Sequence, residues 1–212
     1  VYNEIEIPRG GEFDLVLADG TQVWLNAESR LRYPVEFSGK ERKVVLEGEA
    51  YFQVKKNPSL PFRVEIRNQV IEVLGTEFNV SGYKDEVHVY TTLVNGKVKV
   101  ATTGRDMTLL PGEQCVLDTG DGSMIRQQVD VDKIISWKKG KFILEEQTLE
   151  QIMQKLARWY DITVFYQNPA LKNKVFKGSV PRYAELQQVL NILEKTGEVQ
   201  FHIQNRTVIV KE

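Results

Sequence analysis

The spacing of apolar residues changes near residue 134, and this change constrains the possible folds more than any other feature of the chain. Up to about residue 132, short strand-like runs are separated by turn-forming residues, a pattern typical of an all-β domain. Beyond that point, apolar residues recur at every third or fourth position, which predicts amphipathic helices. We therefore predict two domains, residues 1–133 and residues 134–212.

Turn signals in the first region predict antiparallel hairpins. The dipeptides Asp19-Gly20 and Asn95-Gly96 each separate two strand-like runs, and both supply the positive φ angles that a tight hairpin turn needs. We expect one hairpin over residues 15–25 and another over residues 87–100. Many short strands with frequent turns favour an all-β domain, built as a sandwich or a solenoid-like stack, with a barrel as a further alternative.

The second region predicts a small α+β domain. Apolar residues fall on one helical face over residues 149–157, and Thr148 with Gln151 forms a capping-box signature at the start. A second helix is predicted over residues 186–193, with Gly197 placed to end it. With the strand-like runs around them, the order is β-α-β-β-α-β-β, so the whole chain is mainly β. These runs are Lys141–Leu144, Ile162–Tyr166, Val175–Val180, Val199–Gln204 and Thr207–Val210.

Charge and hydropathy exclude several classes of protein. The 28 Lys and Arg against 29 Asp and Glu give a net charge of −1, which lacks the basic excess of a nucleic-acid-binding domain. Residues 136–212 are more basic than the rest, with 12 cationic and 8 anionic side chains. The longest apolar run, Leu15–Ala18, is far short of the roughly 18 residues of a membrane-spanning helix. No signal peptide is recognised, and because the sequence begins with Val1 we expect a fragment or a processed form.

Residues that could carry chemistry are few. His88 and His202 lie between apolar neighbours, and strand alternation would turn both imidazoles outward, away from any shared metal. Cys115 lies in an apolar run and is expected to be a buried small side chain rather than a nucleophile. Glycine-rich phosphate-binding motifs are absent. We therefore predict no catalytic residue, no metal and no cofactor.

An enzymatic or sugar-binding alternative rests on two carboxylates. Glu47 and Glu49 would lie on one side of a strand, about 6.6–6.8 Å apart at Cα, within the range used by glycosidases. Gly48 between them points instead to close backbone packing. A carbohydrate-active or carbohydrate-binding envelope protein that uses Glu47 and Glu49 is therefore kept as the alternative function.

Several phrases of the first region resemble the FecR family of bacterial envelope signalling proteins. The resemblance runs from about residue 8 to residue 118, and it depends on the order and spacing of the phrases together. They are Leu17-Ala-Asp-Gly-Thr-Gln-Val-Trp-Leu-Asn-Ala-Glu-Ser29, Arg42-Lys-Val-Val-Leu-Glu-Gly-Glu-Ala-Tyr-Phe-Gln-Val54, Pro61-Phe-Arg-Val64, Val73-Leu-Gly-Thr-Glu-Phe-Asn-Val80, Asn95-Gly-Lys-Val98 and Leu110-Pro-Gly-Glu-Gln114.

The second region resembles the secretin/TonB short N-terminal type of domain that closes many such proteins. This resemblance is more diffuse than the first. It is carried by Trp137, the start at Gly140-Lys-Phe142, the helix from Leu149 to Leu156, Trp159-Tyr160 and the helix from Leu186 to Leu193.

The resemblance implies a non-enzymatic, single-pass inner-membrane regulator. In such proteins a cytoplasmic segment controls an extracytoplasmic-function sigma factor, and the periplasmic region binds the signalling domain of a TonB-dependent outer-membrane transducer. This chain would be the periplasmic portion alone, with contact to the sigma factor and the membrane made only by segments absent from it. A part of a secretin-like channel remains a further alternative.

A protein partner could dock on an unpaired edge strand of the small domain, because such an edge can accept a strand from another chain. The candidate edges are residues 207–210 and residues 162–166. Tryptophan and tyrosine side chains near them could act as anchors. The predicted partner-binding residues are Trp159, Tyr160, Ile162, Tyr166, Tyr183, Thr207, Val208, Ile209 and Val210. The β domain would be a spacer, a relay or a second recognition surface.

Overall fold

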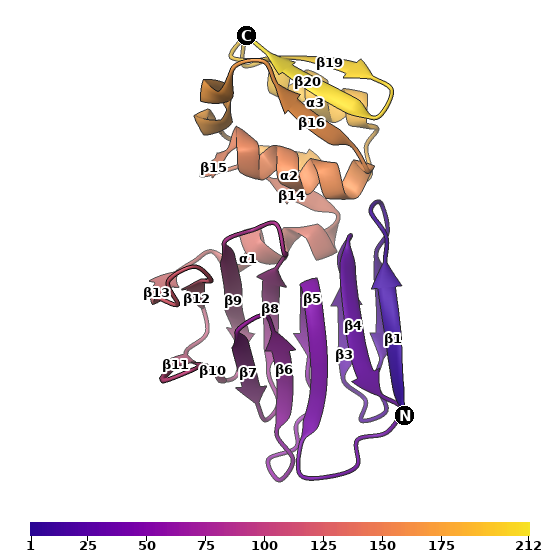
Figure 1. Cartoon of the computed structure of the whole chain (residues 1–212), viewed down its shortest axis with the longest axis vertical. Coiled ribbons are helices and arrows are strands. Elements are labelled where there is room, and N and C mark those ends of the chain that lie inside the picture. The colour runs from indigo at the N-terminus through magenta and orange to yellow at the C-terminus, as the bar shows by residue number, and fades with distance from the viewer. The chain divides into compact units, whose positions relative to one another are not determined.

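The computed structural model describes residues 1–212, and its chain divides into two compact units. The N-terminal unit comprises Val1–Ile135 and the C-terminal unit Ser136–Glu212 (Figure 1). The division falls two residues beyond the boundary expected from the sequence. Thirteen strands in the first unit, and only three α-helices in the chain, make the protein mainly β, as predicted. None of the helices has the length and apolar character needed to cross a membrane.

Two antiparallel-rich sheets form the N-terminal unit, and they share one long strand, β5. The first sheet has the order β1-β4-β5-β6-β7-β10-β11, and the second has the order β2-β3-β5-β8-β9-β12-β13. The strands are β1 (Tyr2–Ile7), β2 (Phe13–Val16), β3 (Gln22–Leu25), β4 (Ser29–Pro34), β5 (Arg42–Gln53), β6 (Phe62–Ile66), β7 (Gln69–Val73), β8 (Glu77–Gly82), β9 (His88–Asn95), β10 (Val98–Thr102), β11 (Arg105–Leu109), β12 (Glu113–Asp118) and β13 (Met124–Gln128). A short helix α1 (Val131–Ile134) and a 3-10 helix η1 (Ile135–Lys139) follow.

The core of this unit lies between the two sheets. In β5, Val44 and Leu46 are buried along the part that pairs with the first sheet, and Ala50 and Phe52 along the part that pairs with the second. Buried and less buried residues alternate along β3, β6, β7 and most of β5, because every second side chain of a strand points to the core. Cys115 in β12 belongs to the same core and is fully buried, as expected.

The hairpin predicted over residues 15–25 is present, whereas the one predicted over residues 87–100 is wrong. Strands β2 and β3 pair across the turn at Asp19-Gly20. Strand β9, however, pairs with β8 and β12, and β10 pairs with β7 and β11. The turn at Asn95-Gly96 therefore carries the chain from one sheet to the other. Its Gly96 lies against Thr76, whose hydroxyl donates to the Lys97 carbonyl at 3.0 Å.

The C-terminal unit packs helices against a three-stranded sheet with the order β16-β20-β19 (Figure 1). Helix α2 begins as predicted, because Thr148 and Gln151 form both hydrogen bonds of a capping box. The elements are β14 (Lys141–Ile143), β15 (Gln147–Thr148), α2 (Leu149–Tyr160), β16 (Thr163–Tyr166), η2 (Pro169–Asn173), β17 (Val175–Phe176), β18 (Ser179–Pro181), α3 (Leu186–Glu194), β19 (Gln200–Gln204) and β20 (Thr207–Lys211).

Two details of the prediction for this unit differ from the structure. The single strand expected over residues 175–180 is divided into β17 and β18, which pair with β15 and β14 respectively. The two-residue strand β15 has no alternating pattern of its own and is defined only by its partner. Helix α3 ends at Glu194 with Lys195 as its cap, ahead of Gly197, whose φ is positive.

Candidate functional site

The sheet of the C-terminal unit has two edges, and β20 is not one of them. Strand β20 pairs with β16 on one side and with β19 on the other. The prediction that residues 207–210 form a free edge is therefore wrong, because both sides of that strand are already hydrogen-bonded. The other candidate, residues 162–166, contains β16, which is an edge strand.

The two edges differ in their hydrogen bonding. The amides of Thr163 and Gln167 donate to the carbonyls of residues 206 and 210, at 2.8 and 3.0 Å. The backbone N–H and C=O groups of Val164 and Tyr166 therefore point away from β20. On the opposite edge, the outward amide of Phe201 in β19 donates to the Glu194 carboxylate at 2.7 Å. The β19 edge is thus partly closed by helix α3, and β16 offers the more complete set of backbone donors and acceptors.

One face of this sheet packs on the helices, and the other, called here the outer face, is directed to solvent. Val164, Val208 and Ile203 belong to the packed set, and the residues between them face the other way. Phe165 lies on the outer face with 58% of its surface exposed. In register, the outer face carries two complete rows: Thr163, Thr207 and Gln204; Phe165, Ile209 and His202. The third row pairs Lys211 with Gln200, and Gln167, which follows the end of β16 and donates its amide to the Val210 carbonyl, continues it.

The nine predicted partner-binding residues are not gathered in one place. Ile162, Val208 and Val210 are buried in the core, so their side chains are not offered to a partner. Thr207 and Ile209 lie on the outer face. That these residues bind a partner stays a prediction.

Tyr166 packs its ring against the same core from the inner side of β16. Burial raises the pKa of its hydroxyl, with a smaller contribution from Glu150. The Lys172 ammonium lies 5.3 Å from the centre of the ring, and it also pairs with Glu150 at 2.8 Å. Tyr166 is therefore anchored within the unit beside the free edge, with a cation nearby.

The remaining three predicted residues surround the turn that follows β18. The Trp159 indole N–H donates to the Arg182 carbonyl at 2.6 Å, and the Tyr160 hydroxyl donates to the Ala184 carbonyl at 2.6 Å. Burial raises the pKa of Tyr160. The Tyr183 ring meets that of Trp159 edge-on, with centroids 5.7 Å apart. Trp159 and Tyr160 hold this turn in place, so their polar groups are engaged within the unit.

Gly140 explains how Tyr183 can lie where it does. This glycine has a φ of 73°, and a Cβ atom added to it would come within 2.8 Å of the Tyr183 ring. A side chain would therefore displace the ring and strain the backbone. Tyr183 itself is 64% exposed.

Sequence reasoning missed Phe165, the most exposed large apolar residue of β16. Thr163–Tyr166 is a run of β-branched and aromatic residues, and it lacks the polar alternation that would have marked the outer face. The partner strand β20 is also a run of β-branched residues, and only the structure shows that Val208 and Val210 are buried whereas Ile209 is not. His202 is exposed between Phe201 and Ile203, as predicted.

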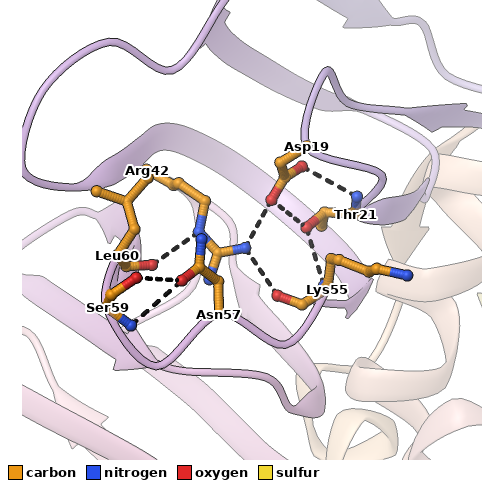
Figure 2. Close-up of polar contacts among 7 residues, drawn as sticks. All are labelled: Asp19, Thr21, Arg42, Lys55, Asn57, Ser59 and Leu60. Carbon is orange, nitrogen blue, oxygen red and sulfur yellow. Dashed lines mark hydrogen bonds and ion pairs between the residues drawn. The ribbon is translucent and has the colours of Figure 1, made fainter.

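In the N-terminal unit, the most prominent polar cluster surrounds Arg42 (Figure 2). Its side chain is 1% exposed, and Nη1 donates to the Asp19 carboxylate at 2.7 Å and to the Lys55 carbonyl at 2.8 Å. Nε donates to the Leu60 carbonyl at 2.9 Å. Figure 2 shows the guanidinium between the turn that carries Asp19 and the loop from Lys55 to Leu60. The cluster fastens two loops to the start of β5 and has the properties of a structural centre.

The two glutamates of the enzymatic alternative belong to different environments. Glu47 lies where β5 pairs with β4 and forms an ion pair with Lys84 at 2.7 Å. Glu49 lies where β5 pairs with β8, and its carboxylate accepts from Asn26 at 2.7 Å and Asn79 at 3.0 Å. Each carboxylate is thus held by neighbours of its own.

Gly48 marks the point at which β5 passes from one sheet to the other. It has a φ of 90°, and an added Cβ would lie 2.4 Å from the Ser29 hydroxyl oxygen and 2.8 Å from Ser29 Cα. The backbone here is crowded, as the sequence indicated. Residues that could ligate a metal do not form any cluster of three or more.

Comparison with known proteins identifies two family matches. Residues 3–99 match the family described as FecR protein, and residues 141–210 match FecR, C-terminal. Two crystal structures of a "putative anti-sigma factor" from Parabacteroides distasonis ATCC 8503, at 1.65 and 2.50 Å resolution, are similar over the full length. Each is 28% identical with a TM-score of 0.91; the matches cover 99% and 100% of this chain and 99% of each of the other chains. No curated protein matches.

Proposed function

Because the chain belongs to the FecR family of anti-sigma regulators, we propose that it receives a signal by binding the signalling domain of a TonB-dependent outer-membrane transducer. The proposed location is the periplasm, as part of a single-pass inner-membrane protein. The proposed result of binding is control of an extracytoplasmic-function sigma factor. Similarity over the full length to a "putative anti-sigma factor" supports this assignment, and the family is generally not enzymatic.

The free edge of β16 is the observation that carries the proposal. A signal delivered by another protein needs a surface that can form specific contacts, and an unpaired strand offers main-chain hydrogen bonds to an incoming strand. Val164 and Tyr166 present such groups, whereas the amide of Phe201 on the opposite edge is already taken by Glu194. We therefore assign docking of the transducer to β16.

Proline substitution at the two edges tests this assignment. In Val164→Pro the outward N–H of β16 is removed without loss of a bond inside the sheet, which edge strands tolerate. Ile203→Pro is the matched control, because Ile203 is also half-buried, belongs to the same core and lies on the opposite edge. The probe is the recombinant signalling domain of a TonB-dependent transducer from the same organism, and binding is measured by titration calorimetry.

We expect Val164→Pro to weaken binding at least about ten-fold, since it removes a donor and obstructs the incoming strand. Ile203→Pro should bind as the unchanged chain does. Circular dichroism of both variants checks that they fold. Absence of any binding by the unchanged chain would refute the proposed function, and equal binding by all three proteins would refute the use of β16.

A further inference from the structure

The outer face of the C-terminal sheet has the composition of a protein interface. Its middle row places Phe165 beside Ile209 and His202, and the rows on either side contain only Thr, Gln and Lys. An apolar centre with an aromatic residue and a polar rim is the arrangement found in protein interfaces. Phe165 is 58% exposed at this centre, and it belongs to β16, so the outer face continues from the proposed docking edge.

The outward face of the first sheet in the N-terminal unit is built differently. On this face, Lys99 pairs with Asp106 at 2.8 Å and Arg63 pairs with Glu72 at 2.6 Å. Such cross-strand ion pairs satisfy their own charges and are typical of a solvated sheet face. The outer face of the C-terminal sheet has no carboxylate among its nine residues, so its single ammonium, that of Lys211, has no opposite charge on the face.

We propose that the outer face binds an apolar surface with an acidic rim on the signalling domain of the transducer, an inference that rests on the proposed function. Charge complementarity identifies this occupant. The face is free of carboxylates and carries Lys211, and the C-terminal unit has 12 cationic against 8 anionic side chains. An acidic partner would gain both attraction and orientation from it. A second copy of the chain would bring the same cation and no carboxylate, which disfavours self-association through this face.

A phenylalanine pair of similar exposure tests the apolar centre. Phe165→Ala removes the aromatic ring at the middle of the outer face and leaves the backbone edge of β16 intact. Phe13→Ala is the matched control, because Phe13 is 50% exposed and lies on an edge strand of the other unit. With the same recombinant signalling domain as probe, we expect Phe165→Ala to weaken binding at least about ten-fold and Phe13→Ala to leave it unchanged.

A charge reversal tests the acidic rim. Lys211→Glu should weaken binding by about three- to ten-fold at low salt, and the affinity of this variant should depend less on salt than that of the unchanged chain. Lys177→Glu is the control, because Lys177 is exposed but lies outside the sheet. Stronger binding by Lys211→Glu would overturn the assignment of an acidic partner.

The outcomes separate this inference from the proposed function. No binding by the unchanged chain would refute both. Binding by the unchanged chain together with equal binding by Phe165→Ala would overturn the outer face and leave the proposed function standing. Light scattering addresses the remaining occupant: a dimer of the unchanged chain that Phe165→Ala converts to a monomer would assign the face to a second copy and overturn the inference.

Discussion

Each unit of the protein contains an arginine that is only 1% exposed, Arg42 in the first and Arg182 in the second, and the two have different surroundings. Arg42 is 1% exposed and is held by the Asp19 carboxylate and by two carbonyls. Arg182 is also 1% exposed, but its guanidinium lies 3.9 Å from the centre of the Trp159 ring and 5.3 Å from that of Phe142. The Arg42 cation therefore has a fixed counter-charge beside it, and the Arg182 cation has aromatic faces beside it.

The difference has a structural consequence. Carboxylate and carbonyl acceptors impose direction, so Arg42 fixes the positions of the turn at Asp19 and of the loop that ends at Leu60 (Figure 2). An aromatic face attracts a cation without a directed hydrogen bond, so it constrains the distance of a guanidinium group more than its orientation. In the C-terminal unit the Trp159 indole N–H also donates to the Arg182 carbonyl, and this hydrogen bond orients the backbone at Arg182.

Removal of the counter-charge should have the largest effect on stability. Asp19→Ala leaves the Arg42 cation buried without its carboxylate, and loss of one partner of a buried pair costs about 3–5 kcal/mol. Asp19→Asn is the milder control, because an amide oxygen can still accept from Arg42. Urea denaturation followed by fluorescence measures the free energy of unfolding.

The double variant Asp19→Ala with Arg42→Met sharpens this result. If the cost comes from an uncompensated charge, removal of the charge as well should restore part of the lost stability. A double variant that is as unstable as the sum of the two single variants would instead assign the cost to lost loop contacts.

Replacement of the aromatic face should cost less. Trp159→Leu removes the ring beside the Arg182 guanidinium together with one hydrogen bond, and we expect a loss of about 2–3 kcal/mol in unfolding free energy. Trp159→Phe keeps an aromatic ring but no donor, and should lose only about 1 kcal/mol. Equal losses in the two variants would show that the hydrogen bond, and not the ring over the cation, provides the stability.

Features that depend on residues close together in the sequence could be predicted from it. The capping box of Thr148 and Gln151 and the apolar face of α2 are contained within one helix and its first turn. The burial of Cys115 and the exposure of His202 likewise follow from their apolar neighbours. In each case the deciding interactions lie within a few residues.

Strand pairing could not be predicted in the same way. The turn sequence Asn95-Gly96 is compatible with a hairpin, but β9 and β10 pair with strands of different sheets. The central position of β20 depends on a parallel pairing with β16, which begins 44 residues earlier in the chain. Local patterns do not encode such register, so only the structure could choose between the two candidate edges and show the outer face.

Neither arginine was recognisable as buried, since arginine is mostly exposed unless it is paired. The carboxylate that pairs with Arg42 lies 23 residues away, and the ring beside Arg182 comes from the preceding helix. A buried cation thus depends on partners that only the fold brings together.

The third and smallest predicted effect on stability concerns Cys115. This buried thiol has no counter-charge and remains neutral. Burial raises the pKa of its thiol to about 11, above the ordinary value of about 8.5–9. The folded state therefore holds its proton where the unfolded state loses it, so stability should fall as the pH rises above about 9, by about 1 kcal/mol at pH 9.5. Cys115→Val should remove this part of the pH dependence in urea denaturation between pH 8 and pH 10. A thiol that reacts rapidly with an aromatic disulfide reagent in the folded protein at pH 8 would contradict the burial on which the prediction rests.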